Sequence, residues 1–322
     1  MLYLNSKDIM RAITLDEVMD AVSEAYLLFD KGTCYVPERA FYAYGGKKML
    51  YMPCFSPEAL MTKILSYFPE NYKDGKPLLD GVILWNDAKS GEILSIMDAK
   101  KITSLRTAAA GGLGVSYLSS PESKNLGIVG MGAQGLHLAL FASTVRNIEN
   151  IYLFDNYQKD ASAFSAKLDE MLGRHVECVM CADPADLLKE SDIVITATTS
   201  ATPVLPDDAA LYAGKCLIGV GSFSPSMREF PAAIWSKADT AYVDLEYALK
   251  ESGDLSQPFD EGLLKAGGVK KISTLIGGPI LPPAKGKCNF FKTVGMSLVD
   301  MTTAAVVYKN ALAKGIGQKI EG

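Results

Sequence analysis

A single segment dictates the architecture of this chain: Asn125-Leu126-Gly127-Ile128-Val129-Gly130-Met131-Gly132-Ala133-Gln134-Gly135. It reads as a short apolar strand that runs into a glycine turn and then into a helix. Gly130 makes the tight turn, Gly132 lets the backbone approach a pyrophosphate, and Gly135 lets the helix pack close to the strand. The N-terminus of such a helix offers backbone N–H groups to phosphate. The segment therefore predicts a dinucleotide site.

An acidic residue completes this pattern. Asp155 follows the next apolar strand, Ile151–Phe154, and lies twenty residues after Gly135. A carboxylate at this place accepts hydrogen bonds from the adenosine ribose hydroxyls, which favours NAD over NADP. Lys159 is close enough in the sequence to reach a 2′-phosphate, so NADP stays possible. The alternative is a glycine-rich turn in an ordinary α/β sheet, but the order of strand, glycines, helix, strand and acid favours the cofactor site.

Apolar strands alternate with helical stretches between residues 126 and 221, which predicts an α/β fold with parallel strands and right-handed crossovers. The expected strands are Leu126–Gly130, Ile151–Phe154, Val176–Met180, Asp192–Ala197, Cys216–Val220 and, as an extension, Thr240–Val243. Thr196, Thr198 and Ser200 follow the fourth strand at its carboxyl end, where ligands bind in open α/β sheets. We expect them to flank the cofactor. For Ser200, local hydrogen bonds to the backbone are the alternative.

The first part of the chain has a different pattern, typical of an α+β domain. A helix at Leu15–Phe29 precedes short alternating strands such as Met61–Phe68, and a helix of small residues covers Thr103–Val115. The last helix, Met296–Ala313, is amphipathic and is expected to return to this region. The sequence therefore predicts a second domain at residues 1–118 and 298–322, and a Rossmann dinucleotide-binding domain at residues 119–297.

The composition limits the partners. A chain of 322 residues with 48% apolar content is long enough for two cores. The formal net charge is −5 and no basic run stands out, which argues against a nucleic-acid partner and favours a small molecule. The N-terminus lacks a secretory pattern, so we expect a cytoplasmic protein that does not insert into membranes. The closest cysteines, Cys178 and Cys181, have no second pair or histidine cluster, so no metal site is expected.

Three cationic residues are candidates for chemistry. Lys63 lies on an apolar strand face, and a buried ammonium needs an anionic partner. The alternative is a stem that covers apolar surface while the ammonium reaches water. Arg106 falls in the first turn of the helix that starts at Thr103, where a cation opposes the helix dipole and calls for a counter-charge. Arg39 offers a guanidinium suited to carboxylates. For either arginine, the alternative is a structural ion pair.

Together these segments resemble the ornithine cyclodeaminase and mu-crystallin family. The resemblance rests on Val36–Arg39, Tyr51–Pro53, Lys63–Asn71, Ser104–Ala109, Gly130–Gln134, Thr196–Ser200 and Phe291–Gly295. It implies a homodimer formed through the first domain. It also implies that Arg39, Lys63 and Arg106 hold the substrate carboxylate near the nicotinamide, with Lys63 as the catalytic residue and Met52 beside the substrate. The cofactor-binding residues expected on this basis are Arg106, Thr107, Gly130, Met131, Gly132, Ala133, Gln134, Gly135, Asp155, Asn156, Thr196, Ala197, Thr198 and Val220.

The chain departs from true cyclodeaminases at the residues that manage the second amine. Leu50 stands where they carry a glutamate, and Phe223 and Met227 stand at their aspartate and lysine. A one-residue slip of the match gives Ser222, which is still not a carboxylate. Leu50, Phe223 and Met227 are therefore expected to line the substrate site with apolar surface.

The resemblance thus favours NAD(P)H-dependent reduction of an α-imino acid or cyclic ketimine, with Δ1-pyrroline-2-carboxylate to L-proline as the best guess. Three alternatives stay open. One is an alanine dehydrogenase or an iminosuccinate reductase, the latter requiring Arg228 to turn inward as a second carboxylate ligand. The other two are an ornithine cyclodeaminase and a mu-crystallin-like protein that binds nucleotide and ligand without turnover.

Overall fold

The computed structural model describes residues 1–321, and the chain divides into two compact units. Unit 1 comprises Met1–Arg106 and the chain from Gly295 onward, and unit 2 is Thr107–Val294. The first division falls inside helix α3 (Ala99–Leu118), which is continuous through it. The domain limits expected from the sequence lie instead at the end of that helix and just inside the last one, because a continuous helix carries no composition change to mark a boundary.

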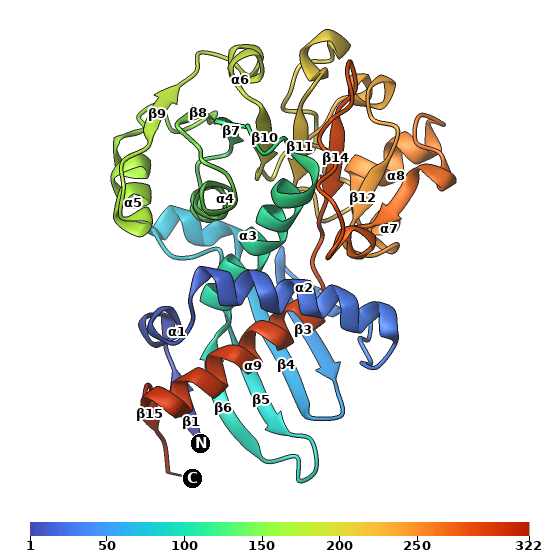
Figure 1. Ribbon diagram of the computed structural model, residues 1–322. Helices are drawn as coiled ribbons and strands as arrows, with labels where there is room; N and C mark the ends of the chain where they lie inside the picture. Colours follow the sequence, from blue (N-terminus) through green and yellow to red (C-terminus); the bar gives the residue numbers. More distant parts are fainter. Residues whose placement is uncertain (322) are drawn as a thin grey trace. The chain divides into compact units, whose positions relative to one another are not determined.

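Unit 1 is built on a seven-stranded sheet in the order β15-β1-β6-β5-β4-β3-β2. Its pairs are antiparallel except for β1 with β6. The strands are β1 (Leu2–Leu4), β2 (Ala40–Tyr44), β3 (Lys47–Phe55), β4 (Ala59–Tyr67), β5 (Leu79–Asp87), β6 (Ile93–Asp98) and β15 (Gln318–Lys319). The turns expected at residues 74–77 and 90–91 separate these strands. Figure 1 shows β1 and β15 side by side, so both chain ends lie at one edge of this sheet.

Three helices belong wholly to unit 1: α1 (Ser6–Ala12), α2 (Leu15–Lys31) and α9 (Ser297–Lys314). Thr14 and Glu17 form a capping box at the start of α2, and Gly32 ends it in the left-handed conformation. Helices α2 and α9 cross over the strands together (Figure 1). The last helix therefore returns to the first part of the chain, as expected. Its amphipathic character holds only for its second half, because the turns from Ser297 to Ala304 are buried on all sides.

Unit 2 is an α/β sandwich around an eight-stranded parallel sheet in the order β13-β12-β14-β11-β10-β7-β8-β9. The strands are β7 (Asn125–Val129), β8 (Asn150–Phe154), β9 (Glu177–Met180), β10 (Ile193–Thr196), β11 (Cys216–Gly219), β12 (Ala241–Val243), β13 (Val269–Lys271) and β14 (Asn289–Lys292). All six expected strands are present. Strands β13 and β14 were not predicted, because strands of three or four residues carry little periodic signal. In the sheet, β14 separates β12 from β11.

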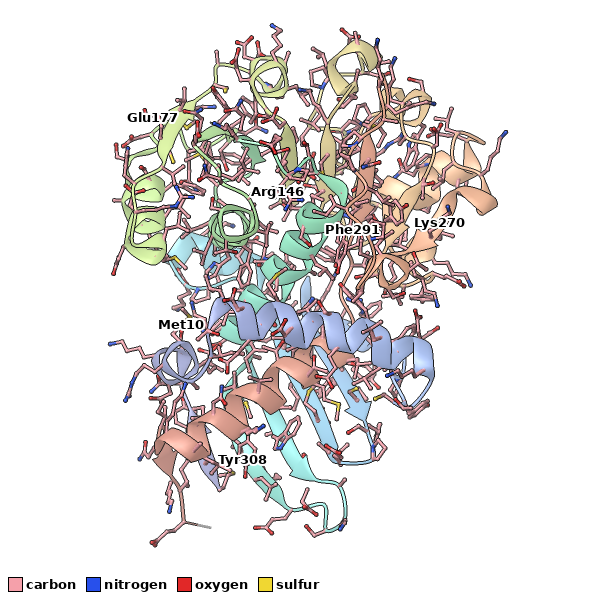
Figure 2. The ribbon with its side chains drawn as sticks, viewed as in Figure 1. Met10, Arg146, Glu177, Lys270, Phe291 and Tyr308 are labelled. Carbon is pink, nitrogen blue, oxygen red and sulfur yellow. The ribbon has the colours of Figure 1, made fainter. Side chains whose placement is uncertain are left out.

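Helices cover both faces of this sheet, as doubly wound folds require. They are α4 (Ala133–Val145), α5 (Ser162–Leu172), α6 (Pro184–Glu190), α7 (Ala248–Glu251) and α8 (Gly253–Asp260), with single 3-10 turns at Ala209–Tyr212, Ala232–Ser236, Ala266–Gly268 and Ile272–Leu275, and a further one in unit 1 at Pro69–Asp74. One core contains Val194, Leu217 and Phe290 and packs against α6 and α8. On the opposite face, Phe291 (labelled in Figure 2) packs against Gly114 of α3. Within residues 1–321, no helix combines the length and apolarity that a membrane span needs.

Candidate functional site

The glycine turn of unit 2 has the geometry that its sequence predicts. Gly130 adopts a positive φ of 101°, and its N–H donates to the carbonyl of Phe154 at 2.9 Å. A Cβ on Gly135 would overlap the carbonyl oxygen of Gly130, so only glycine allows this approach of helix and strand. A Cβ on Gly132 would have no atom within 4 Å, which leaves open space beside the turn. The residues present therefore fit a bound pyrophosphate at the start of α4, where no side chain of the described residues caps the helix.

Asp155 lies at the carboxyl end of β8 and is held by the backbone. Its Oδ2 accepts the N–H of Met131 at 2.8 Å, and its Oδ1 accepts the N–H groups of Tyr157 and Gln158 at 2.8 and 3.1 Å. Burial opposes ionisation, but these backbone hydrogen bonds outweigh it and keep the pKa of the carboxyl below its usual value. Lys159 donates to the carbonyl of Asp155 at 2.8 Å. The site thus has a carboxylate fixed by the backbone, and the ammonium of Lys159 is hydrogen-bonded to a backbone carbonyl. Asn156 follows Asp155 and is exposed.

The carboxyl end of β10 carries the expected polar residues. The order of the strands reverses between β7 and β10, which is the point where doubly wound sheets bind ligands. Thr196 is fully buried there, and its Oγ1 has no hydrogen-bond partner among the described residues. Ala197 and Val220 continue the strands through backbone bonds to Val129 and Thr196. Ser200 donates to the carbonyl of Thr202 at 2.6 Å, which is the local bonding that was its alternative.

The cationic cluster of unit 1, defined here as Lys63, Arg106 and Asp300, is buried. Lys63 on β4 is 1% exposed, and its Nζ lies 2.5 Å from Oδ2 of Asp300 on α9. Nε of Arg106 on α3 lies 3.0 Å from Oδ1 of the same carboxylate. Arg39 lies nearby in unit 1, and its Nη2 donates to the carbonyl of Gly295 at 2.9 Å. Two buried cations therefore share one anion, and the cluster carries a net positive charge.

Two expectations about these residues need correction. Lys63 does not reach water, so the alternative of an exposed ammonium is wrong. Arg106 is not in the first turn of its helix, because α3 begins at Ala99, where Asp98 accepts the N–H of Lys101 at 3.0 Å. The positive end of the helix dipole is therefore not the reason why Arg106 needs a counter-charge. Asp300 supplies it instead.

The pKa values in the cationic cluster follow from burial and from the neighbouring charges. Burial lowers the pKa of Lys63 to about 8, the carboxylate of Asp300 acts against this shift, and the guanidinium of Arg106 adds to it. Burial opposes the ionisation of Asp300, but Arg106 and Lys63 outweigh it and hold its pKa below the usual value. Asp300 is therefore an anion at neutral pH, while Lys63 is a cation that loses its proton as the pH rises through about 8.

Neither Asp300 nor Gly295 was predicted as a site residue, although Gly295 ends the segment Phe291–Gly295 that carries part of the family resemblance. Asp300 is the one acidic residue in the otherwise uncharged start of the last helix, Met296–Thr303, and this isolation was the available signal. Gly295 has a φ of +74°, and a Cβ on it would overlap the guanidinium of Arg106. Because Arg39 donates to its carbonyl, Gly295 contacts both arginines and fixes their spacing.

The residues that distinguish this chain from cyclodeaminases lie in both units. In unit 1, Met52 on β3 is buried and pairs in register with Lys63, and Leu50 is partly buried two residues before it. In unit 2, Phe223 is 52% exposed and Met227 is partly buried, in the loop that follows β11.

Arg228 in the same loop is committed to another contact. Its Nη1 lies 2.9 Å from Oε1 of Glu261, and its Nε donates to the carbonyl of Phe230. The inward turn considered for an iminosuccinate reductase is not the conformation of this structure.

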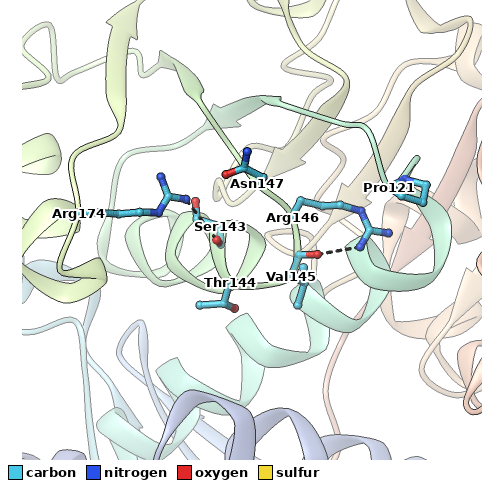
Figure 3. A pocket seen from close by; sticks show the side chains of 7 residues that line it. All are labelled: Pro121, Ser143, Thr144, Val145, Arg146, Asn147 and Arg174. Carbon is cyan, nitrogen blue, oxygen red and sulfur yellow. Dashed lines mark hydrogen bonds between the residues drawn. The ribbon is translucent and has the colours of Figure 1, made fainter.

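A hollow of about 440 Å³ at the end of α4 is a weaker candidate. It is lined by Pro121, Ser143, Thr144, Val145, Arg146, Asn147 and Arg174 (Figure 3). The guanidinium of Arg146 donates to Val145 and to the last carbonyls of α3, and Arg174 donates to the carbonyl of Ile148. Both arginines therefore stabilise the backbone here. Within residues 1–321, no group of three or more His, Cys, Asp or Glu side chains has the arrangement to hold a metal ion.

Known proteins resemble this chain over its whole length. The sequence pattern of the Ornithine cyclodeaminase/mu-crystallin family matches residues 1–315. The Δ1-pyrroline-2-carboxylate reductase of Bacillus cereus is 33% identical, with 100% of both chains covered. The structure of the Thermococcus litoralis Δ1-pyrroline-2-carboxylate reductase in complex with NADH and L-proline is 32% identical, with a TM-score of 0.91 and 99% and 100% of the two chains covered. An archaeal alanine dehydrogenase dimer with bound NAD is 27% identical, with a TM-score of 0.89 and 100% and 99% covered.

Proposed function

The chain belongs to the ornithine cyclodeaminase/mu-crystallin family, and from this premise we propose that it reduces Δ1-pyrroline-2-carboxylate to L-proline with NADH. The observation that carries the proposal is the cationic cluster, in which two buried cations share the single carboxylate of Asp300. A buried excess of positive charge is costly unless an anion binds to it. An imino acid supplies such an anion through its carboxylate.

Each cation has a distinct role in holding that carboxylate. Arg106 uses Nε toward Asp300, so its two terminal nitrogens are the pair that can grip a second carboxylate. Lys63 adds a compact positive charge, and Arg39 is anchored through the carbonyl of Gly295. Asp300 keeps the cations together in the absence of substrate. The arrangement fixes the acid group, and with it the orientation of the imine carbon.

NADH, when bound at the glycine turn of unit 2, supplies the hydride that the imine carbon accepts. The imine nitrogen must carry a proton so that the product is an amine, and Lys63 is suited to hold or relay that proton because its pKa is about 8. With NADH bound, Asp155 would accept hydrogen bonds from the ribose hydroxyls, which supports NADH over NADPH.

The apolar residues support an imino acid without a second charged group. Leu50, Met52, Phe223 and Met227 offer no carboxylate to bind the side-chain ammonium of ornithine. Arg228 is bonded to Glu261 and offers no free cation to a second carboxylate. A small or cyclic aliphatic imino acid fits these groups best. The alanine dehydrogenase relative makes the imine of pyruvate the second candidate.

A substrate panel tests the proposal directly. Purified protein and NADH are mixed in turn with Δ1-pyrroline-2-carboxylate, pyruvate plus ammonia, and iminosuccinate, and the nicotinamide absorbance is followed. Ornithine is assayed separately for release of ammonia. We expect the highest kcat/KM with Δ1-pyrroline-2-carboxylate. The proposal would be rejected if the nicotinamide absorbance stayed constant with every imino acid. It would also be rejected if ornithine released ammonia without a net change in NADH.

The sheet of unit 1 supports a homodimer. The face with Lys63 is buried under helices, whereas the residues that point the other way are only partly buried and, apart from Thr62, apolar. They are Pro53, Thr62, Ile64, Val82, Leu84 and Ile96. At the edge, Tyr42 is 69% exposed and its ring makes an edge contact with that of Tyr51. A contiguous apolar face of this kind marks an interaction surface. Sedimentation should show a dimer, and Tyr42→Glu should shift it toward monomer; a wild-type monomer would contradict this assignment.

A further inference from the structure

A second buried ion cluster lies in unit 2 and was not singled out from the sequence. The acidic cluster, defined here as Glu229, Asp254 and Lys292, has side chains that are at most 1% exposed. Nζ of Lys292 lies 3.2 Å from Oδ2 of Asp254 and 3.9 Å from Oε2 of Glu229. Buried ion pairs contribute little to stability compared with apolar packing. Their presence at the carboxyl end of the sheet therefore calls for an explanation other than stability.

The sheet makes room for Lys292. Thr196, Gly219 and Lys292 stand side by side in the register of three neighbouring parallel strands, and so their side-chain positions are on the same face. A Cβ on Gly219 would lie 3.0 Å from the ring of Phe230, 3.1 Å from Cδ of Lys292 and 3.6 Å from its Nζ. Glycine at this position lets the lysine stem cross β11 toward the loop that follows it.

Glu229 joins the two chain segments that leave β10 and β11. Its Oε1 accepts the N–H and the hydroxyl of Thr198 at 2.7 and 2.8 Å. Its Oε2 accepts the N–H groups of Gly221 and Ser222 at 2.7 and 3.1 Å. Three of these four partners are backbone donors that cannot accept a hydrogen bond. Burial raises the pKa of Glu229, whereas the ammonium of Lys292 and the hydrogen bonds from Thr198 favour its ionised form.

Asp254 closes the other end of the same loop. Its Oδ1 accepts the N–H of Glu229 at 2.6 Å and that of Phe230 at 3.0 Å. Its Oδ2 faces Lys292. The segment Gly221–Arg228, named here the specificity segment, is therefore fastened at its start by the side chain of Glu229 and just beyond its end by Asp254. It contains Phe223 and Met227, the residues that replace the charged groups of cyclodeaminases.

We propose that the acidic cluster is a positioning device that fixes the specificity segment, with Lys292 as the cation that holds the two carboxylates in place. This inference rests on the proposed function, because it assigns Phe223 and Met227 to substrate selection. Lys292 acts through Glu229 and Asp254 and contacts neither ligand in this scheme. Its loss leaves two buried carboxylates without compensation, and the loop bonds that they make weaken.

The test compares Lys292→Met with Lys270→Met, a matched control on the exposed edge strand β13 (Lys270 is labelled in Figure 2). The measured quantity is the ratio of kcat/KM for Δ1-pyrroline-2-carboxylate to that for pyruvate plus ammonia. This ratio does not depend on the fraction of active enzyme. We expect Lys292→Met to lower the ratio by about tenfold or more, since small misplacements near a reacting centre cost this much. The control should keep the wild-type ratio.

A charge-balanced variant separates positioning from packing. In Lys292→Met/Asp254→Asn, one carboxylate and one ammonium are lost together, and the amide oxygen of the new asparagine keeps the two backbone bonds. We expect this double variant to recover most of the ratio lost in Lys292→Met. Failure of the double variant to recover any of it would show that the lysine acts through packing, and an unchanged ratio in the single variant would overturn the inference outright.

Two further readouts keep the outcome decisive. Hydrogen exchange of the peptide that covers residues 221–229 should speed up in Lys292→Met and not in the control, and an unchanged rate would contradict the inference even without an activity assay. If Lys292→Met does not fold, Gly219→Ala retains every charge and crowds the lysine stem and the ring of Phe230, and it should lower the same ratio. Absence of turnover in the wild type would instead reject the proposed function.

Discussion

The two buried ion clusters of this molecule use the same kinds of residue in opposite proportions. In the cationic cluster, Lys63 and Arg106 share one carboxylate. In the acidic cluster, Glu229 and Asp254 share one ammonium, and backbone N–H groups satisfy their remaining oxygens. The first cluster is open, because its excess positive charge has no anion among the described residues. In the second, backbone N–H groups bond to the carboxylates, and Lys292 and Asp254 form an ion pair without a hydrogen bond. We therefore assign the open cluster to ligand binding and the second cluster to holding the chain.

Removal of Lys63 should have the largest effect, because it converts the open cluster into a simple pair of Arg106 and Asp300. Lys63→Ala should lower kcat/KM for the imino acid by about a hundredfold or more, since it removes both a carboxylate ligand and a proton donor. NADH affinity, measured by fluorescence titration, should stay unchanged. Lys48→Ala, at an exposed lysine on the neighbouring strand β3, is the control. Turnover retained in Lys63→Ala would remove its assigned role.

Neutralising Asp300 removes the anion of the cationic cluster and tests whether it sets the pKa of Lys63. The ammonium of Lys63 is present below its pKa of about 8, so kcat/KM should fall as the pH rises through that value. Asp300 stabilises the ammonium, and therefore Asp300→Asn should move this limb of the profile to lower pH and reduce kcat/KM at neutral pH by about tenfold. Circular dichroism and thermal unfolding check that the variant is folded. A limb that stays in place would show that Lys63 is not the titrating group.

Gly295→Ala changes the geometry of the cationic cluster and leaves its charges intact. The added Cβ overlaps the guanidinium of Arg106, and the positive φ costs an alanine about 1 kcal/mol of folding free energy. We expect KM for the imino acid to rise several-fold with kcat less affected, because the displaced arginine binds the carboxylate in substrate and transition state alike. Gly32→Ala, at a helix end with a similar φ, controls for backbone strain. Equal KM values in Gly295→Ala and Gly32→Ala would contradict a role for Gly295 in placing Arg106.

Asp155→Ser lies outside both clusters and should act on the cofactor alone. Loss of the carboxylate removes the acceptor for the ribose hydroxyls, so the Kd for NADH should rise several-fold while that for NADPH changes less. Titration of both nucleotides by fluorescence measures the difference. An equal loss of affinity for the two would show that Asp155 does not discriminate between them.

The dinucleotide half was predictable because its signals are local. The roles of Gly130, Gly132 and Gly135 depend on backbone geometry within a few residues. The structure has the positive φ at Gly130, the close approach at Gly135 and open space beside Gly132. Strands β13 and β14 were missed because they are too short to show a period. The start of α3 was misplaced, although Asp98 ahead of Ala99 was an available capping signal.

The ion clusters were less predictable because their partners are distant in sequence. Burial of Lys63 predicted an anionic partner, and that prediction is confirmed. The partner itself, Asp300, is separated from Lys63 by 237 positions. No periodicity or spacing rule links such residues. The same holds for Lys292 and Glu229, whose meeting depends on β14 entering the sheet between β11 and β12.

The path of the chain has a consequence for biosynthesis. Unit 2 is one continuous stretch, whereas unit 1 is assembled from the beginning of the chain and from α9. Domains fold as units while the ribosome extends the chain. The nucleotide-binding unit can therefore fold first, and until α9 is synthesised Lys63 has no contact with Asp300. The proposed carboxylate-binding centre is complete only when the helix that carries Asp300 has been released and docked. We therefore expect a truncated product to bind coenzyme without reducing an imino acid.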